Sequence, residues 1–90
     1  MLETDVKIVN PLGLHARAAA QLVRLAGKFK SRIKLTRLDN AVMADAKSIL
    51  SVLTLAAARG TQLKLNVEGE DEREASSAIA EIIRNGFGEL

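Results

Sequence analysis

The stretch NPLGLHARAAAQLVRLAG, residues 10–27, decides the fold, because a turn passes here into an amphipathic helix. Pro11 and Gly13 are typical turn residues. Beyond them, apolar side chains recur at the spacing of one helix face, and Gly27 is a typical helix end. We therefore predict a helix of about three turns between His15 and Gly27. Its buried stripe is predicted to hold Ala19, Leu22, Val23, Ala26 and Phe29.

His15, the only histidine of the chain, stands where this helix begins. Helices usually begin at Ser, Thr, Asp or Asn, whose side-chain oxygen accepts from a free N–H group of the first turn. Where no such oxygen is present, the free N–H groups and the helix dipole favour an anion such as phosphate. A neutral imidazole is also a nucleophile. His15 is thus a candidate phosphoryl acceptor, with the N–H groups of Ala16 and Arg17 and the Arg17 guanidinium as candidate ligands.

The residues around His15 also fit an exposed helix start that performs no chemistry. No companion acid or second base for His15 is apparent in the sequence. A hydrolase needs more machinery than a lone imidazole, whereas a carrier of a transferred group needs little more. If the site is functional, its composition therefore favours a carrier over an enzyme.

The rest of the chain alternates between strand and helix patterns. Strands with alternating polar residues predict an antiparallel or mixed sheet that has one exposed face, and the longer helices would cover the other. We expect one domain over residues 1–90. The predicted elements are strands in residues 4–10 and 61–69, two short strands within residues 32–45 around an Asp39-Asn40 turn, a short helix opened by Ser48, and a helix in residues 70–87.

Within these elements, particular side chains are predicted to face the core. The two short strands would bury Ile33 and Leu35 and, beyond the turn, Val42. The last helix would bury one face made of Ala75, Ala78, Ile79, Ile82 and Ile83.

Composition excludes several classes of site. The absence of cysteine excludes disulfides and thiolate sites, and one histidine cannot form a histidine metal cluster, so no metal or cofactor is expected. No apolar stretch is long enough to span a membrane and no signal peptide is apparent, so we expect a cytoplasmic protein. Lys and Arg predominate in residues 1–67, which leaves a small nucleic-acid-binding domain as an alternative. The lack of Trp and Tyr, which would stack on bases, argues against it.

Three segments resemble one known family: GLHARAAAQLV (13–23), AKSILSVLTLAAARG (46–60) and EGEDEREA (68–75). They are similar to the phosphocarrier family HPr of the bacterial phosphoenolpyruvate-dependent phosphotransferase system, which includes the nitrogen-branch paralogue NPr. The resemblance runs from about Val6 to the C-terminus. It implies an α+β open-faced sandwich, in which a four-stranded antiparallel sheet carries three helices on one face in the order βαββαβα.

The resemblance also implies roles for three residues. His15 would accept a phosphoryl group on Nδ1 from phosphorylated enzyme I and pass it to an enzyme IIA component, without being an enzyme by itself. Arg17 would contact the phosphoryl group. Ser48 matches a serine that an HPr kinase/phosphorylase modifies in many members. A monomer is expected, because one face would serve all partners.

Two features depart from the commonest family pattern. Ala18 stands where most members have proline, which suits the first turn of a helix. The longer turn at residues 38–40 and the ending NGFGEL (85–90) are similar to NPr, which leaves the sugar and nitrogen branches open. Two related roles are alternatives to that of a carrier. A regulatory paralogue without a carrier role would lack the acceptor histidine, so the presence of His15 argues against it. A domain of a dihydroxyacetone-kinase phosphorelay is usually fused to other domains, whereas we expect a single domain here.

The short helix carries more leucines than one buried stripe can hold. Ile49, Leu50 and Leu53 would therefore form an exposed apolar patch beside His15, a feature that commonly marks a partner surface. Arg17, Arg24 and Lys28 share one face of the first helix and would surround this patch with positive charge. Taken alone, they fit ordinary solvated residues. The predicted docking surface consists of Ala20, Arg24, Lys28, Ile49, Leu50 and Leu53.

Overall fold

The alternating strands build a sheet with one apolar face. The computed structural model describes all 90 residues and places every strand in one antiparallel sheet of order β1-β4-β2-β3. The predicted elements occur in the predicted order, followed by a 3₁₀ turn. Their bounds are β1 Leu2–Lys7, α1 Ala16–Ala26, β2 Arg32–Arg37, β3 Met43–Asp45, α2 Ile49–Leu53, β4 Gln62–Glu68, α3 Glu72–Arg84 and the 3₁₀ turn Gly86–Gly88.

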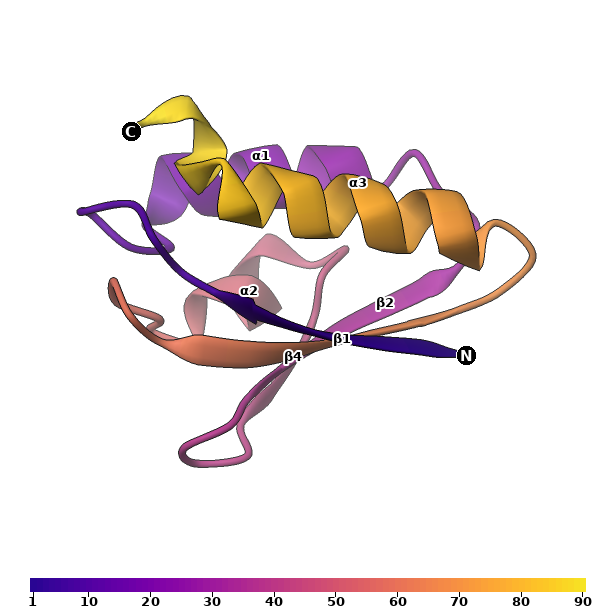
Figure 1. Ribbon diagram of the computed structural model, residues 1–90, viewed down its shortest axis with the longest axis horizontal. Helices are drawn as coiled ribbons and strands as arrows, with labels where there is room; N and C mark the ends of the chain where they lie inside the picture. The colour runs from indigo at the N-terminus through magenta and orange to yellow at the C-terminus, as the bar shows by residue number, and fades with distance from the viewer.

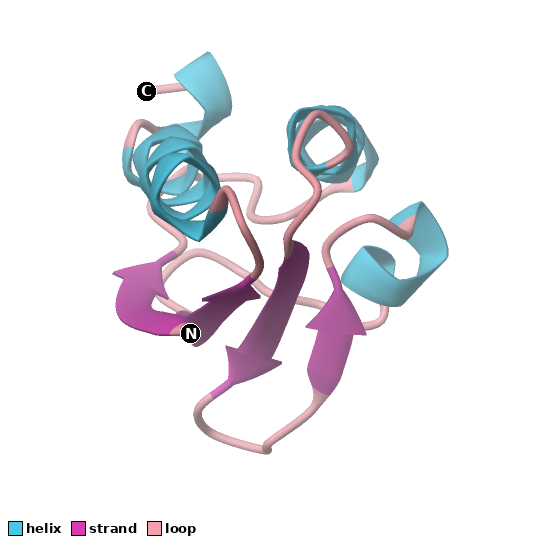
Figure 2. Ribbon diagram, turned by 90° about the vertical axis from the view of Figure 1, so that its right-hand side faces the viewer, coloured by secondary structure: helices cyan, strands magenta, loops and turns pink.

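The core lies between the sheet and the helices. On β4, one of the two inner strands, Leu63, Leu65 and Val67 are fully buried, and Leu65 lies opposite Leu35 of β2. Figures 1 and 2 show α1 and α3 side by side over this face, with α2 at the β3 end of the sheet. The opposite face carries no helix. The predicted open-faced α+β sandwich is confirmed, and no helix combines the length and apolar character that a membrane crossing requires.

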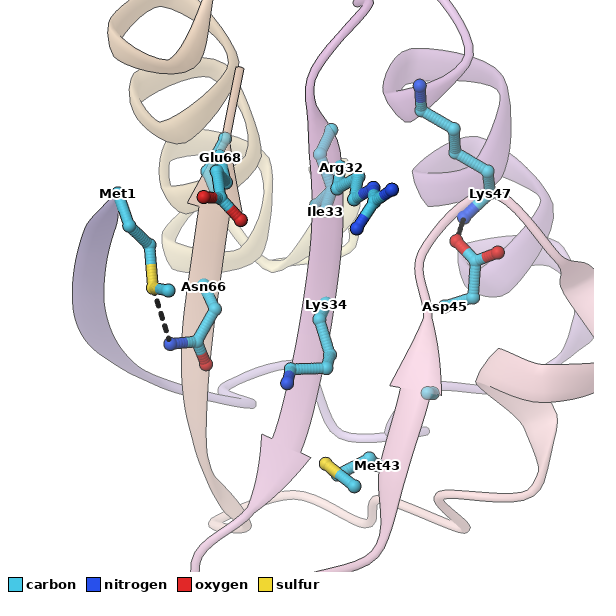
Figure 3. A pocket seen from close by; sticks show the side chains of 11 residues that line it. Met1, Arg32, Ile33, Lys34, Met43, Asp45, Lys47, Asn66 and Glu68 are labelled. Atoms are coloured by element: carbon cyan, nitrogen blue, oxygen red, sulfur yellow. Dashed lines mark hydrogen bonds between the residues drawn. The ribbon is translucent and has the colours of Figure 1, made fainter.

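The open face of the sheet is polar and holds a shallow groove. In Figure 3, Arg32 and Lys34 of β2 lie between Asn66 and Glu68 of β4 on one side and Asp45 of β3 on the other. None of the residues predicted to carry function lines this groove. The fold therefore separates the groove from the helix start at His15.

Some predicted boundaries were wrong. The first strand ends at Lys7 rather than residue 10, because the buried Ile8 leaves the ladder to bond with Gly60 and Thr61 in a turn. Val42 does not belong to a strand and is exposed. The turn there includes a left-handed residue, Ala41 (φ 61°), so that strand β3 begins only at Met43.

The buried face of α3 also differs from its predicted set. Ala78 and Ile82 are only partly buried, whereas Ser76 and Ala80 are buried. The core-facing stripe of α3 is therefore rotated slightly toward Ser76 and Ala80. Val23 of α1 and Phe29, which lies beyond the end of α1, are likewise only partly buried.

Asp71 ties the start of α3 to the loop that precedes β2. Its carboxylate accepts from the N–H groups of Lys30 (2.8 Å) and Ser31 (2.9 Å) and from the Ser31 hydroxyl. The hydrogen bond from Ser31 is the main cause that lowers the pKa of Asp71 below its ordinary value. The ionised form is thus preferred in the folded protein.

We predict that Asp71→Asn destabilises the protein most at neutral pH. A lowered pKa contributes stability that is present above the ordinary aspartate pKa of about 4 and is lost as the pH falls through the lowered value. The difference between the urea midpoints of wild type and variant should therefore shrink between neutral pH and about pH 2.5. An equal difference at both pH values would contradict this role of the Asp71 charge.

Candidate functional site

The start of α1 presents free backbone donors beside an imidazole. His15 is the N-cap residue, has an extended backbone (φ −73°, ψ 178°) and makes no side-chain cap hydrogen bond. The first hydrogen bond of the helix runs from the Ala19 N–H to the His15 carbonyl (2.8 Å). The N–H groups of Ala16, Arg17 and Ala18 donate to no acceptor in the protein. The predicted donors Ala16 and Arg17 are thus available, and Ala18 adds a donor that a proline would lack.

Gly13 anchors the loop that carries His15. Its φ of +68° is left-handed, and an added Cβ would lie only 2.7 Å from the carbonyl oxygen of Ala57. That same carbonyl accepts from the N–H of the buried Leu14 (2.8 Å). Only glycine fits this approach without a shift of the backbone. The loop before His15 is therefore fastened to the chain that follows α2.

The structure supplies the companion acid that the sequence analysis did not find. Nε2 of His15 lies 2.6 Å from Oε2 of Glu89, and an Nη of Arg17 lies 3.7 Å from the same oxygen. The other oxygen, Oε1, accepts from the side-chain amide of Asn10 (2.9 Å). The statement that His15 has no companion acid was therefore wrong, because 74 residues separate the two partners in the chain.

The C-terminal tail reaches this site through a tight reversal after α3. Gly86, Phe87 and Gly88 all have left-handed backbones, with φ values of 62°, 56° and 76°. Phe87 is buried and anchors the reversal, even though such a backbone is unfavourable for a residue other than glycine. Figure 1 shows the resulting yellow turn beside the start of α1. Glu89 thereby returns to His15 and is largely buried.

The charge on Glu89 determines which nitrogen of His15 holds the lone pair. Hydrogen bonds from Asn10 and then from His15, together with the charges of His15 and Arg17, lower the pKa of Glu89 below its ordinary value. The carboxylate is therefore ionised at neutral pH and can only accept. Nε2 of His15 must then donate to it, and in the neutral ring Nδ1 carries the lone pair. The geometry favours Nδ1 as the nucleophile.

Helix α2 leaves an apolar surface exposed. Leu50 is 76% exposed, Ile49 and Leu53 are partly exposed, and Val52 is buried. The N-cap hydroxyl of Ser48 accepts from the Ser51 N–H (3.3 Å), so the predicted helix start at Ser48 is confirmed. α1 packs against α2, and its basic residues Arg17 and Arg24 are exposed, while Ala20 is partly buried. Lys28 is also exposed but lies in the turn after α1 rather than on the helix, because the helix ends at Ala26. Their role in docking stays a prediction.

No three side chains of the metal-binding types come together anywhere in the structure. What the His15 site offers is a nucleophilic nitrogen, three free N–H donors and the positive charge of Arg17, whose side chain is 71% exposed. This set suits the transient attachment of a phosphoryl group.

Comparison with known proteins shows one family over nearly the whole chain. The family model described as the phosphorylation site of the HPr component of the phosphotransferase system matches residues 2–85. The phosphocarrier protein HPr of Cupriavidus necator is 49% identical over 99% of this chain and 98% of its own length. Two crystal structures of HPr from Thermoanaerobacter tengcongensis, both 40% identical, were also matched. HPr-C-His has a TM-score of 0.93 and covers 100% of this chain and 99% of its own, and the HPr dimer has a TM-score of 0.77 and covers 99% and 100%.

Proposed function

Because this chain belongs to the HPr family and is a phosphoryl carrier of the phosphotransferase system, we propose that His15 is its acceptor. In this proposal His15 receives the phosphoryl group from phosphorylated enzyme I and gives it to an enzyme IIA component. One observation carries the assignment. The only imidazole of the chain stands at the start of α1, with its Nε2 held by Glu89 and its Nδ1 free to attack.

The proposed step needs only groups that the chain supplies. Nδ1 of His15 attacks phosphorus as the phosphorus bond to the donor breaks, and the electron pair of that bond stays with the donor. The phosphoryl oxygens are bound by the free N–H groups of Ala16 and Arg17 and by the Arg17 guanidinium. The partner enzyme supplies the rest of the machinery, so the chain itself acts as a carrier and not as an enzyme.

Incubation with enzyme I and labelled phosphoenolpyruvate tests this function. The protein should take up one acid-labile label, because a phosphorus–nitrogen bond breaks readily once its ring is protonated, whereas a phosphoserine survives acid. A protein that takes up no label, or only an acid-stable one, would contradict the proposal.

We also propose that the predicted docking surface binds both enzyme I and the enzyme IIA acceptor. The apolar side chains of α2 would supply contact area, and the basic side chains of α1 and of the turn that follows it would steer acidic partners toward it. One surface would serve each partner in turn, which is why we propose that the protein is a monomer. We also propose that it works in the cytoplasm. Transfer assays with enzyme IIA components of the sugar and nitrogen branches distinguish the two pathways.

Ser48 is proposed as a regulatory phosphorylation site, because its hydroxyl lies at the edge of this docking surface. A phosphate adds about −1.5 to −2 charges there and would oppose docking by repulsion and desolvation. We predict that Ser48→Asp slows phosphorylation of His15 by enzyme I about tenfold. Ser48→Asn is the matched control, since Asp and Asn are equally good N-cap residues and differ in charge.

The initial rate of label uptake at several enzyme I concentrations measures this effect. Equal rates for Ser48→Asp and Ser48→Asn would exclude a charge-based switch at this position.

A further inference from the structure

We propose that Glu89 is a positioning residue that holds a proton on Nε2 of His15 and balances the charge of the phosphorylated ring. This inference rests on the proposed role of His15 and adds a second residue to it. Glu89 lies outside the match to the family model, which ends at residue 85. The inference comes from contacts that the tail of this chain makes.

The carboxylate of Glu89 is fixed on both sides. Oε2 faces Nε2 of His15 at 2.6 Å, and Oε1 accepts from the amide of Asn10 at 2.9 Å. Asn10 is fully buried, and its amide also donates to the carbonyl of Gly13 (2.7 Å). A rigid neighbour thus orients the carboxylate, and the carboxylate orients the imidazole. In catalytic triads an acid orients a histidine in the same way, but there the acid faces Nδ1 and Nε2 reacts, whereas here the two ring nitrogens have exchanged roles.

The reversal of the tail maintains this arrangement against a local backbone cost. Phe87 keeps a left-handed backbone while its ring is buried, and the side chain of Leu90 covers Gly86. Backbone strain of this kind persists only where surrounding contacts enforce it, and it concentrates at functional sites. The product of the reversal is the placement of one carboxylate at Nε2.

The charge balance of phosphoryl transfer gives that carboxylate a task. When neutral His15 forms the bond from Nδ1 to phosphorus, the ring retains its Nε2 proton and becomes positively charged. The ionised Glu89 then faces a cation, and their hydrogen bond becomes charge-assisted on both sides. Arg17 is the other charged group in contact with the cluster, and it lies 3.7 Å from the same oxygen.

The retained proton matters for the onward step. When the bond from Nδ1 to phosphorus breaks, its electron pair returns to the ring, and a ring that keeps the Nε2 proton departs as neutral imidazole. Without that proton the leaving group would be the far more basic imidazolate. Glu89 therefore keeps the phosphoryl group in its transferable form over a wider range of pH.

Glu89→Gln tests this role, with Glu74→Gln as the control because Glu74 is exposed on α3 and undergoes the same change of charge. Each protein is phosphorylated with enzyme I and phosphoenolpyruvate and then freed of enzyme I. Nitrogen NMR of the His15 ring follows the Nε2 proton as the pH is raised. The rate of spontaneous loss of phosphate is measured on the same samples.

We expect the phosphorylated Glu89→Gln protein to lose the Nε2 proton about one pH unit lower than wild type. Above that pH its phosphate should be lost about tenfold more slowly, because one pH unit is a tenfold change in the protonated fraction. The Glu74→Gln protein should behave like wild type.

Equal proton loss and equal dephosphorylation in wild type and Glu89→Gln would overturn the role of Glu89 while leaving His15 as the acceptor. Glu89→Ala removes the carboxylate without adding an amide donor and should show the same shift as Glu89→Gln. Wild-type behaviour of both variants would likewise overturn the role of Glu89. If wild type itself takes no phosphoryl group on His15, the proposed function fails and this inference fails with it.

Discussion

His15→Asn should reduce phosphoryl uptake from enzyme I to background while leaving the protein folded. Asparagine has no nucleophilic ring nitrogen, and the chain contains no second histidine to replace it. As an N-cap residue, however, asparagine is among the best, and His15 makes no cap hydrogen bond. A better cap contributes about 1 kcal/mol to stability in typical proteins, which offsets the lost contact with Glu89.

Two measurements on the same preparation separate chemistry from folding. Label uptake reports the acceptor, and the urea midpoint reports stability, which we expect to be equal to that of wild type or higher. A His15→Asn protein that still takes up acid-labile phosphate would exclude His15 as the acceptor. A protein that loses uptake only because it unfolds would have a much lower urea midpoint than wild type.

Leu50→Glu should raise the KM of enzyme I for this protein about 30-fold, with a much smaller change in kcat. Leu50 is the most exposed apolar side chain of α2, so its replacement leaves the core intact. We place Leu50 among the few side chains that dominate binding at an interface, whose loss costs about 2 kcal/mol, and about 1.4 kcal/mol is a tenfold change in affinity. The added negative charge would also repel an acidic partner.

Leu38→Glu is the matched control for this experiment. Leu38 is also an exposed leucine (45%), but it lies in the turn between β2 and β3 and outside the predicted docking surface. The Leu38→Glu variant should leave the KM of enzyme I for this protein unchanged. Equal KM values for the two variants would show that α2 is not part of the surface that binds enzyme I.

Local patterns were enough to predict most of the fold. The alternation of Leu63, Leu65 and Val67 predicted β4, an inner strand of the sheet, and Ser48 predicted the start of α2. Errors fell where tertiary contacts override a local pattern. Ile8 continues the apolar alternation of β1 but pairs with a turn instead, and Val42 is displaced by the left-handed backbone of Ala41.

The site was only half predictable for a similar reason. His15 and Arg17 stand two residues apart at a helix start, so their proximity follows from local structure. The contact of His15 with Glu89 depends on three successive left-handed residues and on the buried ring of Phe87. Glycines on both sides of Phe87 were the only sign of that reversal in the sequence, and they do not specify where the tail ends up.

The most direct test of the central claim is to locate the phosphoryl group on the wild-type protein. Phosphorus and nitrogen NMR after reaction with enzyme I and phosphoenolpyruvate should show one phosphoryl group, bonded to Nδ1 of His15, with the proton on Nε2. This result follows from the contact of Nε2 with the ionised Glu89, which leaves Nδ1 as the nucleophile. A phosphoryl group on Nε2 of His15, or on any other residue, would contradict it.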